Sequence, residues 1–207
     1  MRSILFCVRL GLATLLFLGC SHAPAHPSTP GLPFLDHQLD AEEYWVLTAV
    51  LKHQTIAADR CEVVLVDRLR APHRWREQLI EGLRADTVQD FERKATDPRR
   101  LLPPVQLKCP VRLLSKEEES ELFSSRLDSG WKRFHERFPN AGRLLSLSRA
   151  GFSEDKTQAL VYLSEGSGPL AGEGLLFLLE RRGEEWQVVK DELLWIAGRE
   201  RARRDFG

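Results

Sequence analysis

The sequence has no excess of charge of either sign and little cysteine. Its 207 residues include 30 basic and 30 acidic side chains, which argues against a protein built mainly to hold nucleic acid, because such proteins carry a basic excess. Four cysteines are too few for a small disulfide scaffold. With 43% hydrophobic and 29% charged residues, the composition predicts an ordinary globular chain of one domain, with room for a tail.

Long hydrophobic runs are also absent. The apolar run near the N-terminus, Leu10 to Leu18, holds nine residues, whereas a membrane-spanning helix needs about 20. Arg2 and Arg9 precede the run, and no acidic residue does. This pattern predicts that residues 1–19 are a signal peptide that directs export.

The end of this segment resembles a bacterial lipobox. Residues 16–19 read Leu-Phe-Leu-Gly before Cys20, so the resemblance implies cleavage before Cys20 and attachment of lipid to its thiol. Ser21 stands where an Asp commonly retains a lipoprotein in the inner membrane, which favours the outer membrane, facing the periplasm. Ordinary signal cleavage at the small-x-small patterns 21–23 or 23–25 stays open, and it would give a soluble periplasmic or secreted protein.

Removal of the signal peptide makes the chain slightly acidic. Two arginines leave with it, so 28 basic and 30 acidic residues remain. This charge does not attract the chain to anionic lipid, and we expect the membrane to be a partner only through the N-terminal lipid. Residues 199–207 include four arginines and are predicted to be a basic solvated tail; we expect no nucleic-acid partner.

The cysteines divide by position. Cys7 is lost with the signal peptide, and Cys20 is lipidated or lost. Cys61 and Cys109 remain as an even pair in an oxidising compartment, so we predict a disulfide between them. Closing a loop of about 49 residues would stabilise the fold by roughly 4 kcal/mol in the chain-entropy description. Two buried free thiols are the alternative.

Residues 20–39 are predicted to be a proline-rich tether before a single domain at 40–198. The tether contains His22, His26 and His37. A metal-binding tract and a plain polar spacer both fit these histidines, and their irregular spacing favours the spacer.

The first part of the domain is predicted to be mainly helical. Apolar residues recur at helical spacing after capping or proline signals, such as Ser115-Lys-Glu-Glu118. The predicted helices are 41–54, 72–83, 86–95, 115–126 and 129–138. The predicted strands between them are 61–66 and 105–114, both rich in apolar residues.

The last part is predicted to be four strands in an antiparallel meander. The strands alternate or run apolar between turn residues, with a hairpin signal at 182–184. They are 144–149, 158–164, 173–182 and 185–196. The predicted fold is therefore α+β, with N-terminal helices and one or two strands packed on one face of a C-terminal four-stranded antiparallel meander.

Residues 131–196 resemble a family of uncharacterised bacterial exported proteins, many of them lipoproteins. The shared pattern is an aromatic helix, a Pro–Gly turn, a Leu-Ser-Arg-x-Gly-Phe run, an Ala-Leu-Val-Tyr strand, a glycine-rich loop and a Trp-containing hairpin. The matching residues are Trp131, Phe134, Pro139, Gly142, 148–152, 159–162, Gly168, Gly172, Gly174 and Trp186. The resemblance implies export and this architecture, and it does not indicate any activity. Family members commonly carry Cys-x-x-x-Cys in the loop, where this chain has Ser167 and Ala171.

Candidate chemistry is sparse. Residues 166–172 are glycine-rich, but a strand follows them rather than a helix, which favours a strand connection over a phosphate loop. Ser148 and Arg149 sit before a Gly-Phe turn. Together with Gly168 and Gly172 they are a candidate site for a partner or an anion, and a turn-stabilising pair of Arg149 with Glu154 or Asp155 is the simpler interpretation.

No catalytic motif or zinc pattern is present, so we expect no metal and no cofactor. A triad of Ser148, His135 and Asp155 lacks a nucleophile elbow. The sequence favours an exported, lipid-anchored envelope protein with a non-enzymatic binding or structural role and an envelope protein as partner. An envelope hydrolase of unknown substrate, and an assembly or antagonist partner of a neighbouring gene product, are the alternatives.

Overall fold

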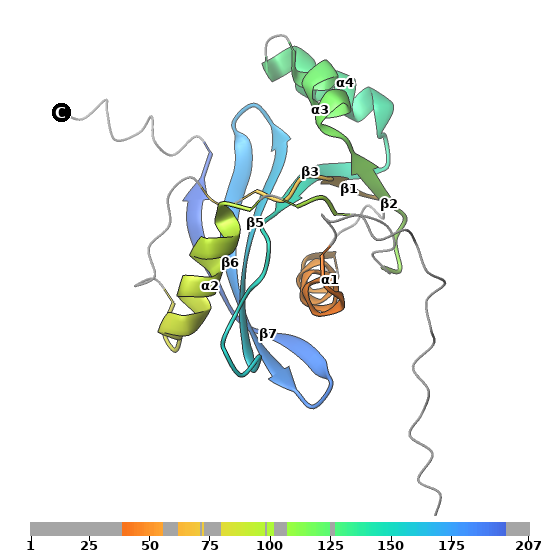
Figure 1. Cartoon of the computed structure of the whole chain (residues 1–207). Helices are drawn as coiled ribbons and strands as arrows, with labels where there is room; N and C mark the ends of the chain where they lie inside the picture. Colours follow the sequence, from red (N-terminus) through yellow and green to blue (C-terminus); the bar gives the residue numbers. More distant parts are fainter. Residues whose placement is uncertain are drawn as a thin grey trace, which may run out of the picture. The chain divides into compact units, whose positions relative to one another are not determined.

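The computed structural model describes residues 39–55, 62–70, 72, 80–97, 99–101, 107–124 and 127–197. All of them belong to one compact unit, residues 35–207 (Figure 1). The predicted signal peptide, the tether with Cys20 and the basic tail lie outside the described residues, apart from Leu39 at the end of the tether. None of the described helices is both long and apolar enough to cross a membrane.

The described residues form four helices and seven strands. The helices are α1 (Ala41–Thr55), α2 (Ala85–Ala95), α3 (Lys116–Phe123) and α4 (Leu127–Arg137). The strands are β1 (Glu62–Val66), β2 (Val111–Leu114), β3 (Ala141–Leu147), β4 (Gly151–Phe152), β5 (Gln158–Gly168), β6 (Ala171–Arg182) and β7 (Glu185–Ile196).

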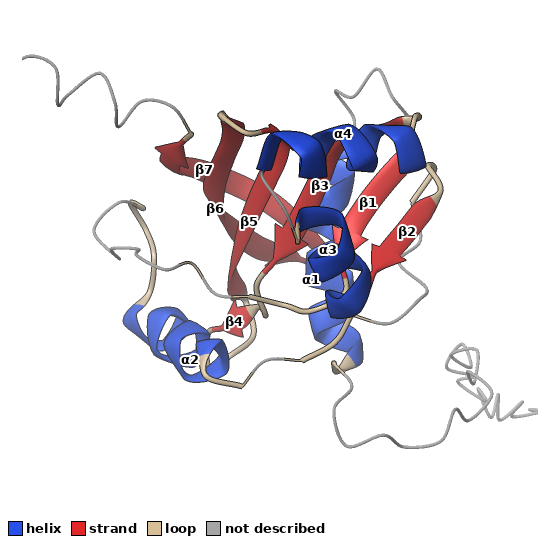
Figure 2. Cartoon of the chain, turned by 90° about the horizontal axis from the view of Figure 1, so that it is seen from above, coloured by secondary structure: helices blue, strands red, loops and turns tan. Residues whose placement is uncertain are grey.

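The seven strands form one mixed sheet in the order β2-β1-β3-β5-β6-β7, with the short β4 paired to β5 (Figure 2). The α+β class is confirmed, and β3, β5, β6 and β7 are antiparallel neighbours as predicted. The prediction that the sheet has four strands was wrong. β1 pairs with β3 in parallel, and β2 pairs with β1 in parallel, so both belong to the same sheet. Residues 63–66 of β1 are all buried, as expected for a strand covered on both faces.

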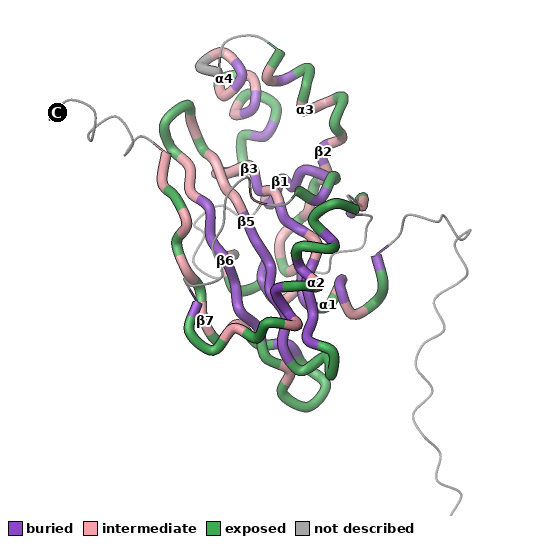
Figure 3. The backbone as a smooth tube through the Cα atoms, turned by 60° about the vertical axis from the view of Figure 1, so that its left-hand side comes forward, coloured by how far each residue is buried: buried purple, intermediate pink, exposed green. Residues whose placement is uncertain are grey.

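Helices cover both faces of this sheet, which corrects the prediction of one covered face. The core cluster on one face joins α1 to β1, β3, β5 and β6. On the other face, α3 and α4 pack on Val64, Leu114 and Ala141, and α2 packs on Leu160 and Leu176. Side chains alternate along a strand, so a sheet with apolar residues at successive positions needs helices on both sides. Figure 3 shows the buried backbone along the middle of the strands.

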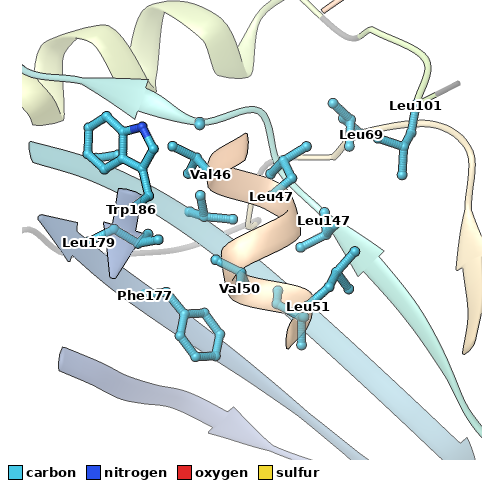
Figure 4. Packing of buried hydrophobic residues seen from close by; sticks show 14 of the residues in the cluster. Val46, Leu47, Val50, Leu51, Leu69, Leu101, Leu147, Phe177, Leu179 and Trp186 are labelled. Carbon is cyan, nitrogen blue, oxygen red and sulfur yellow. The ribbon is translucent and has the colours of Figure 1, made fainter. Parts of the chain in front are cut away.

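The largest core cluster lies under α1. Val46, Leu47, Val50 and Leu51 are fully buried and face the sheet, where Phe177 is 1% exposed (Figure 4). The helix begins as predicted after Asp40, whose Oδ1 accepts a hydrogen bond from the Glu43 N–H at 2.8 Å. A cap and an apolar stripe therefore fix where α1 begins and which side it buries.

Several local predictions are confirmed. The predicted helix 86–95 is α2, and Ser115 and Glu118 form both bonds of the capping box of α3. The predicted hairpin between β6 and β7 turns at Gly183, whose φ of 65° suits glycine. The helix predicted over 72–83 falls largely on residues outside the described ranges. Its described end, residues 80–83, is a turn rather than a helix.

The strand register bears on the predicted disulfide. Cys61 lies outside the described residues, and Cys109 is half-buried against the α1-side core. The pairing of β1 with β2 matches Val63 with Val111, and each cysteine stands two residues before one of these partners. Because Cys61 itself lies outside these pairs, the disulfide stays a prediction.

We therefore expect non-reducing mass spectrometry of the exported protein to find Cys61 and Cys109 in one linked peptide. Cys61→Ser and Cys109→Ser should each lower the free energy of unfolding by about 2–4 kcal/mol, and the double variant by no more than either alone. Labelling of both thiols by maleimide in the unreduced, denatured protein would show that the bond is absent.

Candidate functional site

Arg149 follows β3, and two carboxylates hold its guanidinium. Its Nε and Nη2 donate to the two oxygens of Glu43 at 3.1 and 2.7 Å, and Nη1 donates to Asp97 at 2.7 Å. The side chain of Glu43 is fully buried, and that of Arg149 is 11% exposed. Burial opposes the charge of Arg149, but the hydrogen bond and charge of Glu43, with the charge of Asp97, raise its pKa above the ordinary value. Arg149 thus links α1 to β3 and to the end of α2.

A second charged pair extends this layer along α2. Lys94 Nζ donates to the Ala150 carbonyl at 2.8 Å and lies 2.9 Å from an oxygen of Asp90. Asp90 accepts a hydrogen bond from the Phe152 N–H at 2.8 Å, and Lys94 lies 4.5 Å from the centre of the Phe152 ring. The turn after β3 is therefore tied to α2 through its own backbone groups.

Gly151 allows α2 to approach the sheet this closely. A Cβ at this position would overlap the backbone N and Cα of Phe91. The glycine of the Ser-Arg-Ala-Gly-Phe run is therefore a packing requirement, because any side chain there would push α2 away from β4.

Ser148 is buried and fully engaged within the fold. Its Oγ accepts a hydrogen bond from the Tyr162 N–H at 2.9 Å and donates to the Arg149 carbonyl at 2.8 Å. Ser148, His135 and Asp155 do not form a triad. His135 Nε2 contacts the Ser167 carbonyl at 3.0 Å, and Asp155 binds Arg84. The hydroxyl of Ser148 holds two strands together.

The predicted pair of Arg149 with Glu154 or Asp155 was wrong. Asp155 binds Arg84 instead, with both carboxylate oxygens within 3.0 Å of Nη1. The hydrogen bond from Arg84, followed by those from Ser153 and Thr157, holds the pKa of Asp155 far below its ordinary value. Arg149 does form an internal ion pair, but its partners Glu43 and Asp97 come from distant parts of the chain.

The two predicted glycines lie at the other end of β5. Gly168 pairs with Ala171 at the tip of the β5–β6 hairpin, and Gly172 pairs with Gly166. Ser148 bonds to Tyr162, six residues before Gly168 along the strand, so about 20 Å separates the two pairs. The structure therefore brings Ser148 together with Arg149, and Gly168 together with Gly172, but does not join the pairs in one site.

Two carboxylates oppose each other near this hairpin. Glu165 pairs with Glu173 across the strands, and Glu165 binds Arg143 Nη1 at 2.6 and 2.7 Å. Burial raises the pKa of Glu173, the nearby charge of Glu165 raises it further, and Arg143 opposes both. Arg143 balances the charge of Glu165. Glu173, with its raised pKa, holds its proton more tightly than a free glutamate.

Sequence reasoning missed a pair of tryptophans on the sheet. Trp131 of α4 lies over Gly166, and Trp195 of β7 lies over Gly174. Trp195 is 41% exposed although it is large and aromatic. The glycines were visible in the sequence, but their neighbours become known only once β5, β6 and β7 are in register.

Metal binding finds no support in the described part of the chain. It contains no group of three or more His, Cys, Asp and Glu side chains placed to hold an ion. Every buried side-chain nitrogen or oxygen among the described residues has a hydrogen-bond partner. The buried polar groups described here are therefore satisfied by the fold itself.

Comparison with known proteins gives no relative: no protein-family profile, curated protein or solved structure matches the chain. The resemblance of residues 131–196 to exported bacterial proteins stays a prediction.

The buried ion pair predicts a large effect of one neutral substitution. Glu43→Gln leaves the guanidinium of Arg149 without its buried counter-charge and should lower the free energy of unfolding by about 3 kcal/mol in urea titrations. Glu136→Gln removes the same charge from an exposed pair with Lys132 and should cost less than about 0.5 kcal/mol. Equal losses for the two variants would contradict a structural role for the Glu43 charge.

The Asp90 pair predicts a loss of stability in acid. Burial acts to raise the pKa of Asp90, but the bonds from Phe152 and Lys94 outweigh it, so its pKa lies below the ordinary 3.8. The folded state therefore binds its proton less tightly than the unfolded state, and the stabilisation present near pH 7 is lost as pH falls from about 5 through 3.8 and below.

Asp90→Asn should consequently reduce the difference in urea midpoint between pH 7 and pH 3.5. Asp191 is exposed and forms no ion pair with the described residues, so Asp191→Asn is the matched control and should leave the difference unchanged. An unchanged difference in Asp90→Asn would mean that this carboxylate does not contribute to acid sensitivity.

Proposed function

We propose that this protein is exported and held at the cell envelope by lipid on Cys20, where it acts by binding a partner. The signal-like segment 1–19, the lipobox-like residues before Cys20 and the proline-rich residues 20–39 support this proposal. In the anchored form the domain faces the periplasm from the outer membrane. The tether sets its distance from the bilayer at about 70 Å or less, because an extended residue spans at most about 3.3–3.6 Å.

The binding role is not placed on Ser148 and Arg149. These two candidate residues are bonded to the chain itself, Arg149 to Glu43 and Ser148 to Tyr162. Arg149 is held on two sides by carboxylates, so a free anion would have to displace Glu43 or Asp97. The groups used for stability are therefore not poised for a reaction.

The exposed apolar side chains offer a surface for binding. Three of the five large exposed hydrophobic residues among those described are on β7, and the others are Trp45 and Leu170. The three on β7 are Val189, Leu193 and Trp195. Apolar groups gathered on one element mark interaction sites more often than scattered ones do, so we place the binding role at the β7 edge of the sheet.

Substitution of Cys20 tests the anchor. In the Cys20→Ala variant we expect the precursor to remain unprocessed or to be released from the membrane fraction, and incorporation of labelled palmitate to be lost. Cys7→Ala removes a cysteine from within the signal segment and should leave processing, fractionation and labelling unchanged. If Cys20→Ala is processed and fractionates as the natural chain does, the lipid anchor is excluded.

A further inference from the structure

Two tryptophans lie over glycines on one face of the β5–β6 hairpin. The ring of Trp195 takes the space that a Cβ on Gly174 would need, and a Cβ on Gly166 would lie 2.9 Å from Cζ2 of Trp131. Ser164 pairs with Gly174, and Gly166 lies two residues further along β5, so both glycines belong to the same face. Trp195 therefore covers the cross-strand neighbour of Ser164, and Trp131 covers the next position of β5 on the same face.

Both rings are held in place by contacts within the fold. Trp195 Nε1 donates to the Tyr162 hydroxyl at 3.0 Å, and Trp131 packs edge-on against Phe123 and Phe134 at centroid distances of 5.2 and 5.4 Å. Trp195 nevertheless stays 41% exposed, and Trp131 is half-buried. A ligand would meet rings whose orientation is already fixed, which lowers the entropy lost on binding.

Hydroxyl groups lie on the same face. Ser146 of β3 pairs with Ser164 of β5, and both are half-buried. Neither side chain makes a hydrogen bond with the described residues. We call Trp131, Ser146, Ser164, Gly166, Gly174 and Trp195 the Trp131–Trp195 face; its members carry no charge.

We propose that the Trp131–Trp195 face binds a carbohydrate. A pyranose ring has an apolar C–H side that stacks on an aromatic ring, and it has hydroxyls around its rim. The accessible part of Trp195 suits the C–H side, and Ser146 and Ser164 offer uncharged groups that both donate and accept hydrogen bonds. An anionic ligand would need a cation on this face, and none of its six residues supplies one.

This inference deepens the binding role proposed above by naming the class of ligand. It does not depend on the lipid anchor, because binding of a sugar is measured on the purified protein. Loss of the anchor in the Cys20 experiment and absence of carbohydrate binding are therefore separate results.

The test titrates the full-length protein, in a detergent without a sugar headgroup, with chitohexaose and cellohexaose while tryptophan fluorescence is followed. Co-sedimentation with insoluble peptidoglycan and cellulose covers longer chains. We expect saturable binding to at least one of the four. Trp195→Ala should weaken that binding at least about tenfold, the scale of a central aromatic contact.

Trp45→Ala is the matched control, because Trp45 of α1 is 52% exposed and points away from the α1-side core. It should bind as the natural protein does. Ser164→Arg is the second variant: it keeps both tryptophans and adds a long charged side chain beside the two glycines that they cover, so it should weaken binding as Trp195→Ala does. Thermal unfolding of each variant establishes that it is folded.

The proposal is overturned if none of the four carbohydrates binds the natural protein, or if binding is the same in Trp195→Ala and Trp45→Ala. It is also overturned if sedimentation finds dimers that Trp195→Ala abolishes, because the face would then be an interface between copies of the chain.

Discussion

The fold depends on an ion pair buried between α1 and the end of β3. A carboxylate with the full burial of Glu43 is tolerated only where a cation and N–H groups neutralise it. Arg149 supplies the cation, and the Ala150 N–H adds a bond at 3.3 Å. The partners stand 106 residues apart in sequence, so the pair can form only when α1 is docked on the assembled sheet. It selects one arrangement of helix and sheet over other compact ones.

The same layer explains why the Ser-Arg-Ala-Gly-Phe run has its particular residues. Ser148 joins two strands, Arg149 joins three elements, and Gly151 lets α2 approach β4. The uncharged face around Trp131 and Trp195 lies on the far side of the sheet from α1 and its buried Glu43.

Local patterns in the sequence were enough to predict much of the fold and little of the site. The capping box at Ser115, the stripe of α1 and the turn at Gly183 depend on residues within a few positions of one another. The parallel pairing of β1 with β3 brings together residues that are distant in sequence, and so does the ion pair of Arg149 with Glu43. A run such as Glu-Val-Val-Leu-Val predicts a buried strand and does not name its neighbours. The tryptophan pair was missed for the same reason, since its members come from α4 and β7.

The position of β3 in the sheet also sets an order on folding. β1 pairs with β3 through contacts such as Glu62 with Ala141, about 80 residues away, and among the described strands β2 pairs with β1 alone. Closing so long a loop costs entropy before any contact repays it. The hairpins from β5 to β7 have short loops and can form first, which gives β3 a template. We therefore expect β1 and β2 to join the sheet only after the last third of the chain has emerged, so that the domain assembles from its C-terminal end backwards.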